Sequence, residues 1–279
     1  MFAGTKLHFT PKIGYPSTWR DYSTLEVDAG DLVNFGTLTE AEASGVLEGI
    51  RSLDVPYLFV KGNHDARHRI LDIWPGFHEG GLYGLAIDLG STTIAAHLCD
   101  LRDGSVLASS GVMNPQIRFG EDLMSRVSYA MMNPGGDAEM TTAVRTALNG
   151  LIQSISTEAK IDPKSIYELV FVCNPVMHHL LLGIDPVELG QAPFALATSG
   201  SLVLDAHDLD LAAVNNAARV YILPCIAGHV GADCAAVALS EEPNKSKDMV
   251  LIVDVGTNAE ILLGNKTRVL ACSSPTGPA

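Results

Sequence analysis

Two copies of one short motif constrain this chain more than any other feature. The first copy runs from Ile87 to Thr93 (IDLGSTT) and the second from Val253 to Glu260 (VDVGTNAE). Each has an apolar strand, an Asp, a Gly two residues later, and hydroxyl or amide side chains before a second strand. One D-x-G-S/T motif occurs in many β-hairpins, but two copies in tandem segments indicate one structural unit built twice.

The residue types in both loops suit the binding of a polyphosphate. Glycine allows a tight turn that presents backbone N–H groups to phosphate oxygens, and Ser and Thr add hydroxyl donors. An Asp at a strand end can hold Mg²⁺ through water, so Asp88 and Asp254 are the candidate metal ligands and catalytic carboxylates. The candidate phosphate-binding residues are Gly90, Ser91, Thr92, Thr93, Gly256, Thr257, Asn258 and Glu260. Two such loops facing each other would hold a polyphosphate from both sides.

From Gly84 onward, short aliphatic runs alternate with Ala-rich stretches, which predicts an α/β domain. The expected strands are 83–90, 93–101, 105–112, 169–173, 220–223, 249–255, 259–263 and 268–272. The expected helices are 121–132, 141–159 with Asp137 as a cap upstream, 175–182 and 231–239. A polar linker is expected over 240–247. The strands after it repeat the pattern of residues 84–112.

Composition excludes several classes of function. The formal net charge of -14 makes attraction to nucleic acid or to an anionic membrane an improbable driving force. No apolar run approaches the roughly 20 residues that span a bilayer, and the first residues lack the apolar centre of a secretion signal. We therefore expect a cytoplasmic protein. The five cysteines are scattered without a C-x-x-C pair, which predicts buried free thiols rather than a disulfide framework or a metal knuckle.

The two loops resemble the phosphate-1 and phosphate-2 motifs of the superfamily of acetate and sugar kinases, heat-shock ATPases and actin. The resemblance implies a ribonuclease-H-like α/β sheet, duplicated around a cleft for ATP and Mg²⁺. In that superfamily, a helix between the loops carries an acidic or amide residue that positions the attacking water. The matching stretch is 224–233, so Asp233 is the candidate water-orienting residue or general base, with a helix-capping Asp as the alternative.

Longer segments are similar to the reductive activators of corrinoid proteins, over roughly residues 83–279. These segments are Asn114-Pro115-Gln116, Gly120-Glu121-Asp122, Ser125–Tyr129, Asn174–Pro186 and Ala271–Ala279. The resemblance implies ATP-dependent return of an oxidised Co(II) corrinoid to Co(I), with a 2Fe-2S domain carrying the electron. The implied partner is a corrinoid iron–sulfur protein or a corrinoid methyl-transfer protein.

The sequence departs from that family in two ways. No cysteine precedes Cys99, so the cysteines of a 2Fe-2S cluster are absent. We also expect a first half-domain over 83–240 with the phosphate-1 loop, and only a truncated start of the second over 248–279.

His178 and His179 are adjacent, so on a helix they point about 100° apart and cannot easily chelate one ion. Packing or a partner contact is therefore favoured over a metal or corrinoid ligand.

Residues 1–80 resemble a fragment of a calcineurin-like metallophosphoesterase. Asp28–Asn34 and Val60–Asp65 are similar to its G-D and G-N-H-D blocks, with a helical pattern over 38–53 between them. The resemblance implies Asp31, Asn63 and His64 as ligands of a residual divalent metal, because a two-metal site clamps the attacking and leaving oxygens. The opening D-x-H is missing, since Lys6-Leu7-His8 lacks the Asp.

Three functions follow as hypotheses. The first is the ATP-binding and ATPase portion of a corrinoid activator. The second is a metal-dependent phosphoesterase that uses the N-terminal segment. The third is a catalytically silent fragment that binds a corrinoid partner. The oligomeric state, and whether the chain is a fusion or a fragment, are left open by the sequence.

Overall fold

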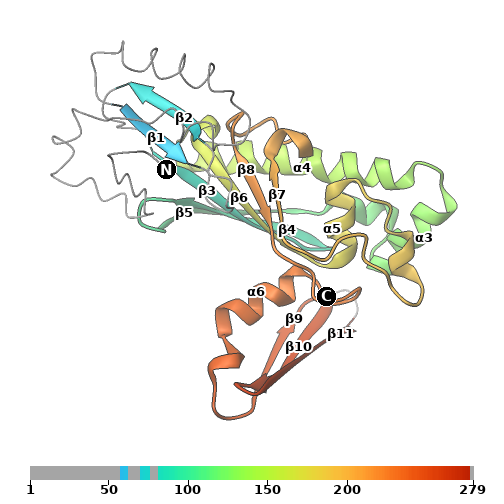
Figure 1. The fold of residues 1–279 in the computed structure, drawn as a ribbon. Coiled ribbons are helices and arrows are strands. Elements are labelled where there is room, and N and C mark those ends of the chain that lie inside the picture. Colours follow the sequence, from blue (N-terminus) through green and yellow to red (C-terminus); the bar gives the residue numbers. More distant parts are fainter. Residues whose placement is uncertain (1–56, 62–69, 76–80, 277–279) are drawn as a thin grey trace, which may run out of the picture. The chain divides into compact units, whose positions relative to one another are not determined.

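The computed structural model describes residues 57–61, 70–75 and 81–276 (Figure 1). The helix expected over 38–53, and the candidate ligands Asp31, Asn63 and His64, lie outside these residues. The chain divides into two compact units, one of Met1–Tyr83 with Asp100–Ser105 and the other of Gly84–Cys99 with Val106–Ala279. In the first unit, β1 (Tyr57–Lys61) pairs antiparallel with β2 (Ile70–Pro75).

A six-stranded sheet forms the first half of the larger fold. Its strands are β3 (Tyr83–Leu89), β4 (Thr93–Asp100), β5 (Val106–Met113), β6 (Ile166–Cys173), β7 (Leu202–Asp205) and β8 (Arg219–Ile222). Their order across the sheet is β5-β4-β3-β6-β8-β7. β4 and β5 pair antiparallel, β6 and β8 pair parallel, and β7 runs antiparallel to β8 at one edge. The mixed sheet agrees with the expected ribonuclease-H-like architecture.

Three helices belong to this half: α3 (Leu123–Met132), α4 (Gly136–Ala159) and α5 (Pro175–Leu182). α4 is amphipathic and packs against β5 and α5, burying Met140, Val144, Leu148, Leu151 and Ile155. It begins one turn earlier than expected. Its N-cap is Gly135 in the left-handed region, and Asp137 lies in the first turn rather than at the cap. The prediction of Asp137 as the cap was therefore wrong, although a carboxylate in that turn still favours the helix dipole.

The elements after β8 are α6 (Ala232–Glu241), which packs against both β6 and β10, and then β9 (Val250–Val255), β10 (Asn258–Asn265) and β11 (Arg268–Pro275). The three strands form an antiparallel meander in the order β11-β10-β9. Cys234 of α6 and Leu262 of β10 form a small core with Val230, against which Ile252 and Val269 pack. This strand–turn–strand–strand arrangement repeats that of β3, β4 and β5, as the duplicated motif predicts.

Several connecting elements were not expected from the sequence. They are β7 and the short 3-10 helices at Pro115–Phe119, Pro163–Ser165, Val187–Gly190, Ala206–Leu209 and Pro243–Lys245. The last of these replaces part of the expected linker. In the part of the chain that the structure describes, no helix is both long and apolar enough to cross a membrane. All five cysteines are free, but only Cys173, Cys225 and Cys234 are buried, while Cys99 is half-buried and Cys272 is exposed.

Candidate functional site

The two glycine loops meet in space although they are far apart in sequence. Thr92 lies between β3 and β4, and Thr257 lies between β9 and β10. Their side-chain oxygens are 2.9 Å apart, so the hydroxyl groups are hydrogen-bonded to each other. The structure therefore brings the two copies of the motif together as facing loops.

Two residues behind the first loop, Asn114 and Arg126, hold three consecutive backbone carbonyl groups. Asn114 Nδ2 donates to the Gly90 carbonyl oxygen at 2.8 Å, and the Asn114 N–H donates to the Thr92 carbonyl oxygen at 2.8 Å. Arg126 Nη2 donates to the Ser91 carbonyl oxygen between them. In a trans peptide the C=O and the next N–H point to opposite sides, so the N–H groups of residues 91–93 point away from these anchors.

Within the described part of the chain, the Ser91 and Thr92 N–H groups donate to no acceptor. Successive N–H groups directed to one side form a concavity that binds anions. Gly90 is needed for this turn, because a Cβ there would lie 2.6 Å from the Thr93 carbonyl oxygen. The first loop thus has the geometry of a phosphate cradle.

The second loop is anchored in a similar way by one hydroxyl group. Thr276 Oγ1 donates to the Gly256 carbonyl oxygen, and it lies 2.9 Å from the Thr257 carbonyl oxygen. The Thr276 N–H also donates to the Thr257 carbonyl oxygen at 3.2 Å. By the same trans geometry, the N–H groups of Thr257 and Asn258 point away from Thr276. Both loops therefore present backbone donors rather than acceptors.

Four carboxylates influence one another at this site. The pKa of Asp88 is raised, first because protein atoms partly desolvate its carboxyl group although the residue is solvent-exposed, and second because Asp254 repels it. Burial raises the pKa of Glu260, and Asp254 and Asp88 raise it further. Glu260 is buried and accepts a hydrogen bond from Ser273 Oγ at 3.2 Å. Mutual repulsion of this kind is relieved when a cation binds among the carboxylates.

Asp233 belongs to the same acidic group. It lies in the first turn of α6, and burial raises its pKa to about 7, with Glu260 and Asp88 adding repulsion. Its Oδ1 accepts a hydrogen bond from the Cys234 N–H at 2.7 Å. The N-cap of α6 is Gly231, so Asp233 supports the helix start from inside the first turn. It also remains within electrostatic reach of Glu260 and Asp88.

These acids do not form a compact metal cage. Among the described residues, the only group of three His, Cys, Asp or Glu side chains with ligand atoms within 4.8 Å of one another is Asp205, His207 and Asp208. Those three residues are at the surface, where Asp205 also pairs with Arg219. A cation at Asp88 and Asp254 would consequently be held largely through water and ligand oxygens, as is usual for Mg²⁺.

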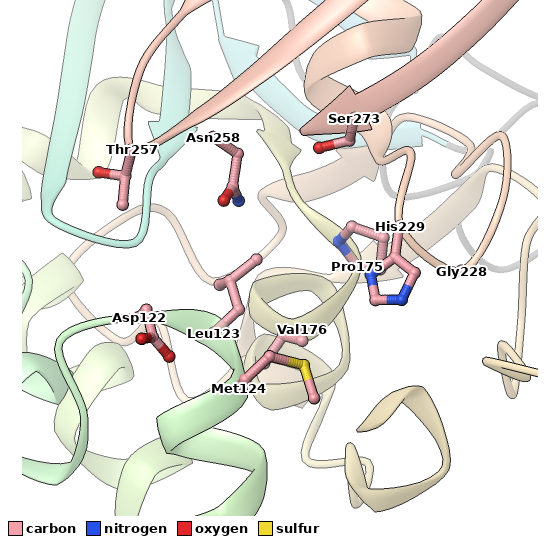
Figure 2. A pocket seen from close by; sticks show the side chains of 10 residues that line it. All are labelled: Asp122, Leu123, Met124, Pro175, Val176, Gly228, His229, Thr257, Asn258 and Ser273. Carbon is pink, nitrogen blue, oxygen red and sulfur yellow. The ribbon is translucent and has the colours of Figure 1, made fainter. Parts of the chain in front are cut away.

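A cavity of about 400 Å³ lies beside the second loop. Thr257, Asn258 and Ser273 line one side, and Asp122, Leu123 and Met124 line the opposite side (Figure 2). The start of α5 and the loop of Gly228 and His229 complete its wall. The cavity opens at the N-terminal ends of α3 and α5, which carry partial positive charge.

The buried network behind the first loop is the part of the site that the sequence did not assign. Gln116 Nε2 donates to the Met140 carbonyl oxygen at 2.9 Å. The Met177 sulfur accepts hydrogen bonds from Asn114 Nδ2 at 3.5 Å and from Arg126 Nη1 at 3.1 Å. Asn114, Gln116 and Arg126 are fully buried. The segments Asn114-Pro115-Gln116 and Ser125–Tyr129 carried the family resemblance. Their polar side chains stand between apolar residues in the sequence, and this pattern is the signal that could have indicated a buried network.

The histidine pair lies in the core. His179 Nδ1 is 2.9 Å from the Pro175 carbonyl oxygen, and its Nε2 accepts from the Ala197 N–H at 3.0 Å. His178 is fully buried, and neither of its ring nitrogens has a partner within the described residues. Burial, followed by the neighbouring His179, lowers its pKa to about 4. The packing alternative is the one that the structure supports.

The fold and the paired loops define a domain of the superfamily that includes acetate and sugar kinases, heat-shock ATPases and actin. Two family models match the chain. They are the RACo middle region over residues 83–246, and the C-terminal domain of RACo, described as the ASKHA domain, over residues 248–279. The chain belongs to the RACo family.

Individual relatives agree with this assignment. The chain is 34% identical over 250 residues to the corrinoid activation enzyme RamQ of Eubacterium limosum, covering 89% of this chain and 40% of RamQ. It is 23% identical over 206 residues to a reductase of the Co(II) methylated amine-specific corrinoid protein of Methanosarcina barkeri, covering 71% of this chain and 37% of the reductase. A solved structure of a reductive activator for a corrinoid, iron–sulfur protein superposes with a TM-score of 0.79 and 32% identity, covering 83% of this chain and 37% of that one.

The chain thus spans less than half the length of the relatives that it matches. The similarity to RamQ covers more of this chain than the segment from Tyr83 to Ala279 provides, so it extends into the residues before Tyr83. The metallophosphoesterase resemblance of those residues is not tested by any of these relatives and stays a prediction.

Proposed function

We propose that this chain is part of the ATP-binding and ATP-hydrolysing portion of a protein that reductively reactivates corrinoid proteins. The observation that carries the proposal is the contact of Thr92 with Thr257, which places two N–H-presenting loops opposite each other beside shared carboxylates. The names of the relatives point to a corrinoid iron–sulfur protein or a methylamine-type corrinoid protein as the partner. A cytoplasmic location belongs to the same proposal.

In this function, the two loops bind the phosphate groups of ATP through backbone N–H groups and the hydroxyls of Ser91, Thr92 and Thr257. Mg²⁺ fits the donor set, because Asp88 and Asp254 repel each other without a cation between them. When bound, the ion neutralises phosphate charge. Asp233 accepts the proton of the attacking water, and a pKa of about 7 suits a general base at neutral pH.

The 2Fe-2S cluster expected of the family does not fit the residues of this chain. All five cysteines are in the described part, and no three of them bring their sulfur atoms within ligand distance of one another. We therefore derive no electron-transfer step from these residues. The proposal for this chain is limited to nucleotide binding, hydrolysis and contact with the corrinoid partner.

Calorimetry with Mg·ATP tests the nucleotide part. We expect saturable binding to the 279-residue chain with a Kd below about 1 mM. The Asp88→Asn variant should lose the dependence on Mg²⁺, while Asp208→Asn, at an exposed carboxylate outside the site, should not. No heat of binding at millimolar Mg·ATP would contradict the proposal. Phosphate release during incubation separates hydrolysis from binding without turnover.

The partner part has its own test. A purified corrinoid iron–sulfur protein in the Co(II) state should bind the immobilised chain, and Mg·ATP should change the dissociation rate. An apo-partner without its corrinoid serves as the control. Equal binding of both forms, with no effect of ATP, would contradict the assignment of the partner.

A further inference from the structure

The phosphate-1 loop rests on a buried positive charge. Arg126 of α3 is fully buried, with its guanidinium group directly behind the loop. Its Nε donates to the Gly120 carbonyl oxygen at 3.0 Å, its Nη1 contacts Gln116 Oε1 at 3.4 Å and the Met177 sulfur at 3.1 Å, and its Nη2 donates to the Ser91 carbonyl oxygen. Every one of these partners is electrically neutral.

Within the described residues, Arg126 makes no ion pair with a carboxylate. Asp122, one helical turn away, acts on it only through space, and burial lowers the pKa of Arg126 to about 10. Taking a charge out of water without a partner is expensive, and it is compensated only when an opposite charge comes close. The N–H groups of Ser91 and Thr92, on the other side of the loop, have no acceptor among the described residues and are directed so as to receive negative charge.

The contact with Ser91 fixes the direction of those N–H groups. Because the Ser91 carbonyl oxygen is held by Arg126, the Thr92 N–H of the same peptide points to the opposite side. Asn114 holds the carbonyl groups on either side of the Ser91 carbonyl group, which belong to Gly90 and Thr92. Arg126 thus occupies the central position of a three-point support for the loop.

The second loop provides an internal comparison. Its carbonyl groups, at Gly256 and Thr257, are held by the hydroxyl and the backbone N–H of Thr276, both neutral. The two loops therefore share their geometry but differ in charge. Carboxylates of both motifs, Asp88 and Asp254, act on each other, but only the first loop is backed by a buried cation.

We propose that Arg126 is a positioning residue of the phosphate-1 loop, which orients the Thr92 N–H through the Ser91 carbonyl group and whose charge is compensated by the phosphate groups of the bound nucleotide. This inference rests on the proposed ATP binding for its second half only. The orientation of the loop is a property of the ligand-free chain and can be tested without nucleotide.

The experiment compares the unmodified 279-residue chain with Arg126→Met, Arg126→Lys and a control, Arg145→Met. Arg145 also donates to a backbone carbonyl group, that of Leu181, but it is paired with Asp210 and lies on α4 away from the loops. Two quantities are measured. One is the hydrogen-exchange rate of the Asn114 backbone N–H, which donates to the Thr92 carbonyl oxygen in the ligand-free chain. The other is the Kd for Mg·ATP.

We expect Arg126→Met to speed the exchange of the Asn114 amide by about tenfold or more, while the Gly256 amide in the second loop is unchanged. We also expect it to raise the Kd for Mg·ATP by at least about tenfold, with Arg126→Lys in between because it keeps the charge and loses the fork. Arg145→Met should change neither quantity.

Unchanged exchange at Asn114 in both Arg126 variants would overturn the positioning role. Equal Kd values for Arg126→Met and the unmodified chain would overturn the charge role. If the unmodified chain binds no Mg·ATP, the proposed function fails, and with it the charge role, but the exchange rates still decide the positioning role. If Arg126→Met does not fold, Arg126→Lys decides: it must speed Asn114 exchange and weaken Mg·ATP binding, and a variant that does neither overturns the inference.

Discussion

Gly231 packs directly against the carbonyl group of Cys173. A Cβ at Gly231 would lie 2.5 Å from the Cys173 carbonyl oxygen and 2.6 Å from the Cα of Asn174. The glycine therefore allows α6 to begin against the end of β6. In this position Asp233 lies within electrostatic reach of Asp88 and Glu260. Gly231 thus allows close approach of helix and strand.

The first prediction concerns this contact. Gly231→Ala should destabilise the chain by about 1–3 kcal/mol, because the added methyl group overlaps backbone that cannot move easily. Urea unfolding followed by circular dichroism measures the change. Gly150→Ala is the matched control, since nothing lies within 4 Å of a Cβ at this position in the interior of α4. It should stabilise by about 0.5–1 kcal/mol. Equal effects of the two substitutions would contradict the packing argument.

The second prediction uses the raised pKa of Asp233. A folded-state pKa of about 7, compared with the ordinary value of 3.8, means that the folded chain binds the proton more tightly than the unfolded chain. That contribution to stability is present below about pH 4 and is lost as pH rises to about 7. Asp233→Asn should therefore match the unmodified chain at pH 4 and exceed its stability at pH 8, on the order of 4 kcal/mol.

The same substitution should lower the rate of ATP hydrolysis by about 10²–10⁴-fold, with little change in the Kd for Mg·ATP, if Asp233 is the general base. Thermal melts at pH 4 and pH 8 and a phosphate-release assay provide the measurements. A variant that gains stability at pH 8 but hydrolyses ATP normally would leave Asp233 as a residue of the helix start alone.

The third prediction concerns His178. Its folded-state pKa of about 4 lies below the ordinary 6.5, so the unfolded chain binds the proton more tightly. Stability should fall as pH decreases from about 6.5 to 4, and a shift of this size corresponds to about 3 kcal/mol. His178→Leu should remove this part of the pH dependence. It should also cost little at pH 7.5, because both ring nitrogens are already without partners among the residues that the structure describes.

Melts between pH 4 and 7.5 measure the difference between the two proteins, in which the other titrating groups cancel. His97→Leu serves as the control, since His97 is exposed on β4 and bonded to Ser109 Oγ at 2.7 Å. The same slope for His178→Leu and the unmodified chain would rule out His178 as the source.

The fourth prediction addresses the second loop. Thr276→Val removes the hydroxyl that donates to the Gly256 carbonyl oxygen. It keeps the shape of the side chain and the Thr276 N–H that donates to the Thr257 carbonyl oxygen. We expect the Kd for Mg·ATP to rise by about fivefold to tenfold, because the loop donors lose their fixed direction. Thr142→Val on α4, whose hydroxyl bonds only to the Ala138 carbonyl oxygen at 2.9 Å, should leave the Kd unchanged. Titration calorimetry decides between them.

Much of the fold follows from local pattern. The strands from β3 to β6 and from β9 to β11 were expected within a few residues, because apolar runs bounded by Gly, Asn and Asp specify strands locally. β7 was not expected. Leu202–Asp205 is a short edge strand with half-buried residues, and only its pairing with β8 makes it a strand.

The sequence by itself determined the two motif loops, the α/β order of elements around them and the family, since all three are written in contiguous residues. Only the tertiary structure decided three relationships. Thr92 is hydrogen-bonded to Thr257, Asp88 and Glu260 repel the carboxylate of Asp233, and Arg126 donates to the Ser91 carbonyl oxygen. The physical reason is that these relationships join residues from different elements. Their distances and desolvation depend on how helices and strands pack, which no local stretch of sequence specifies.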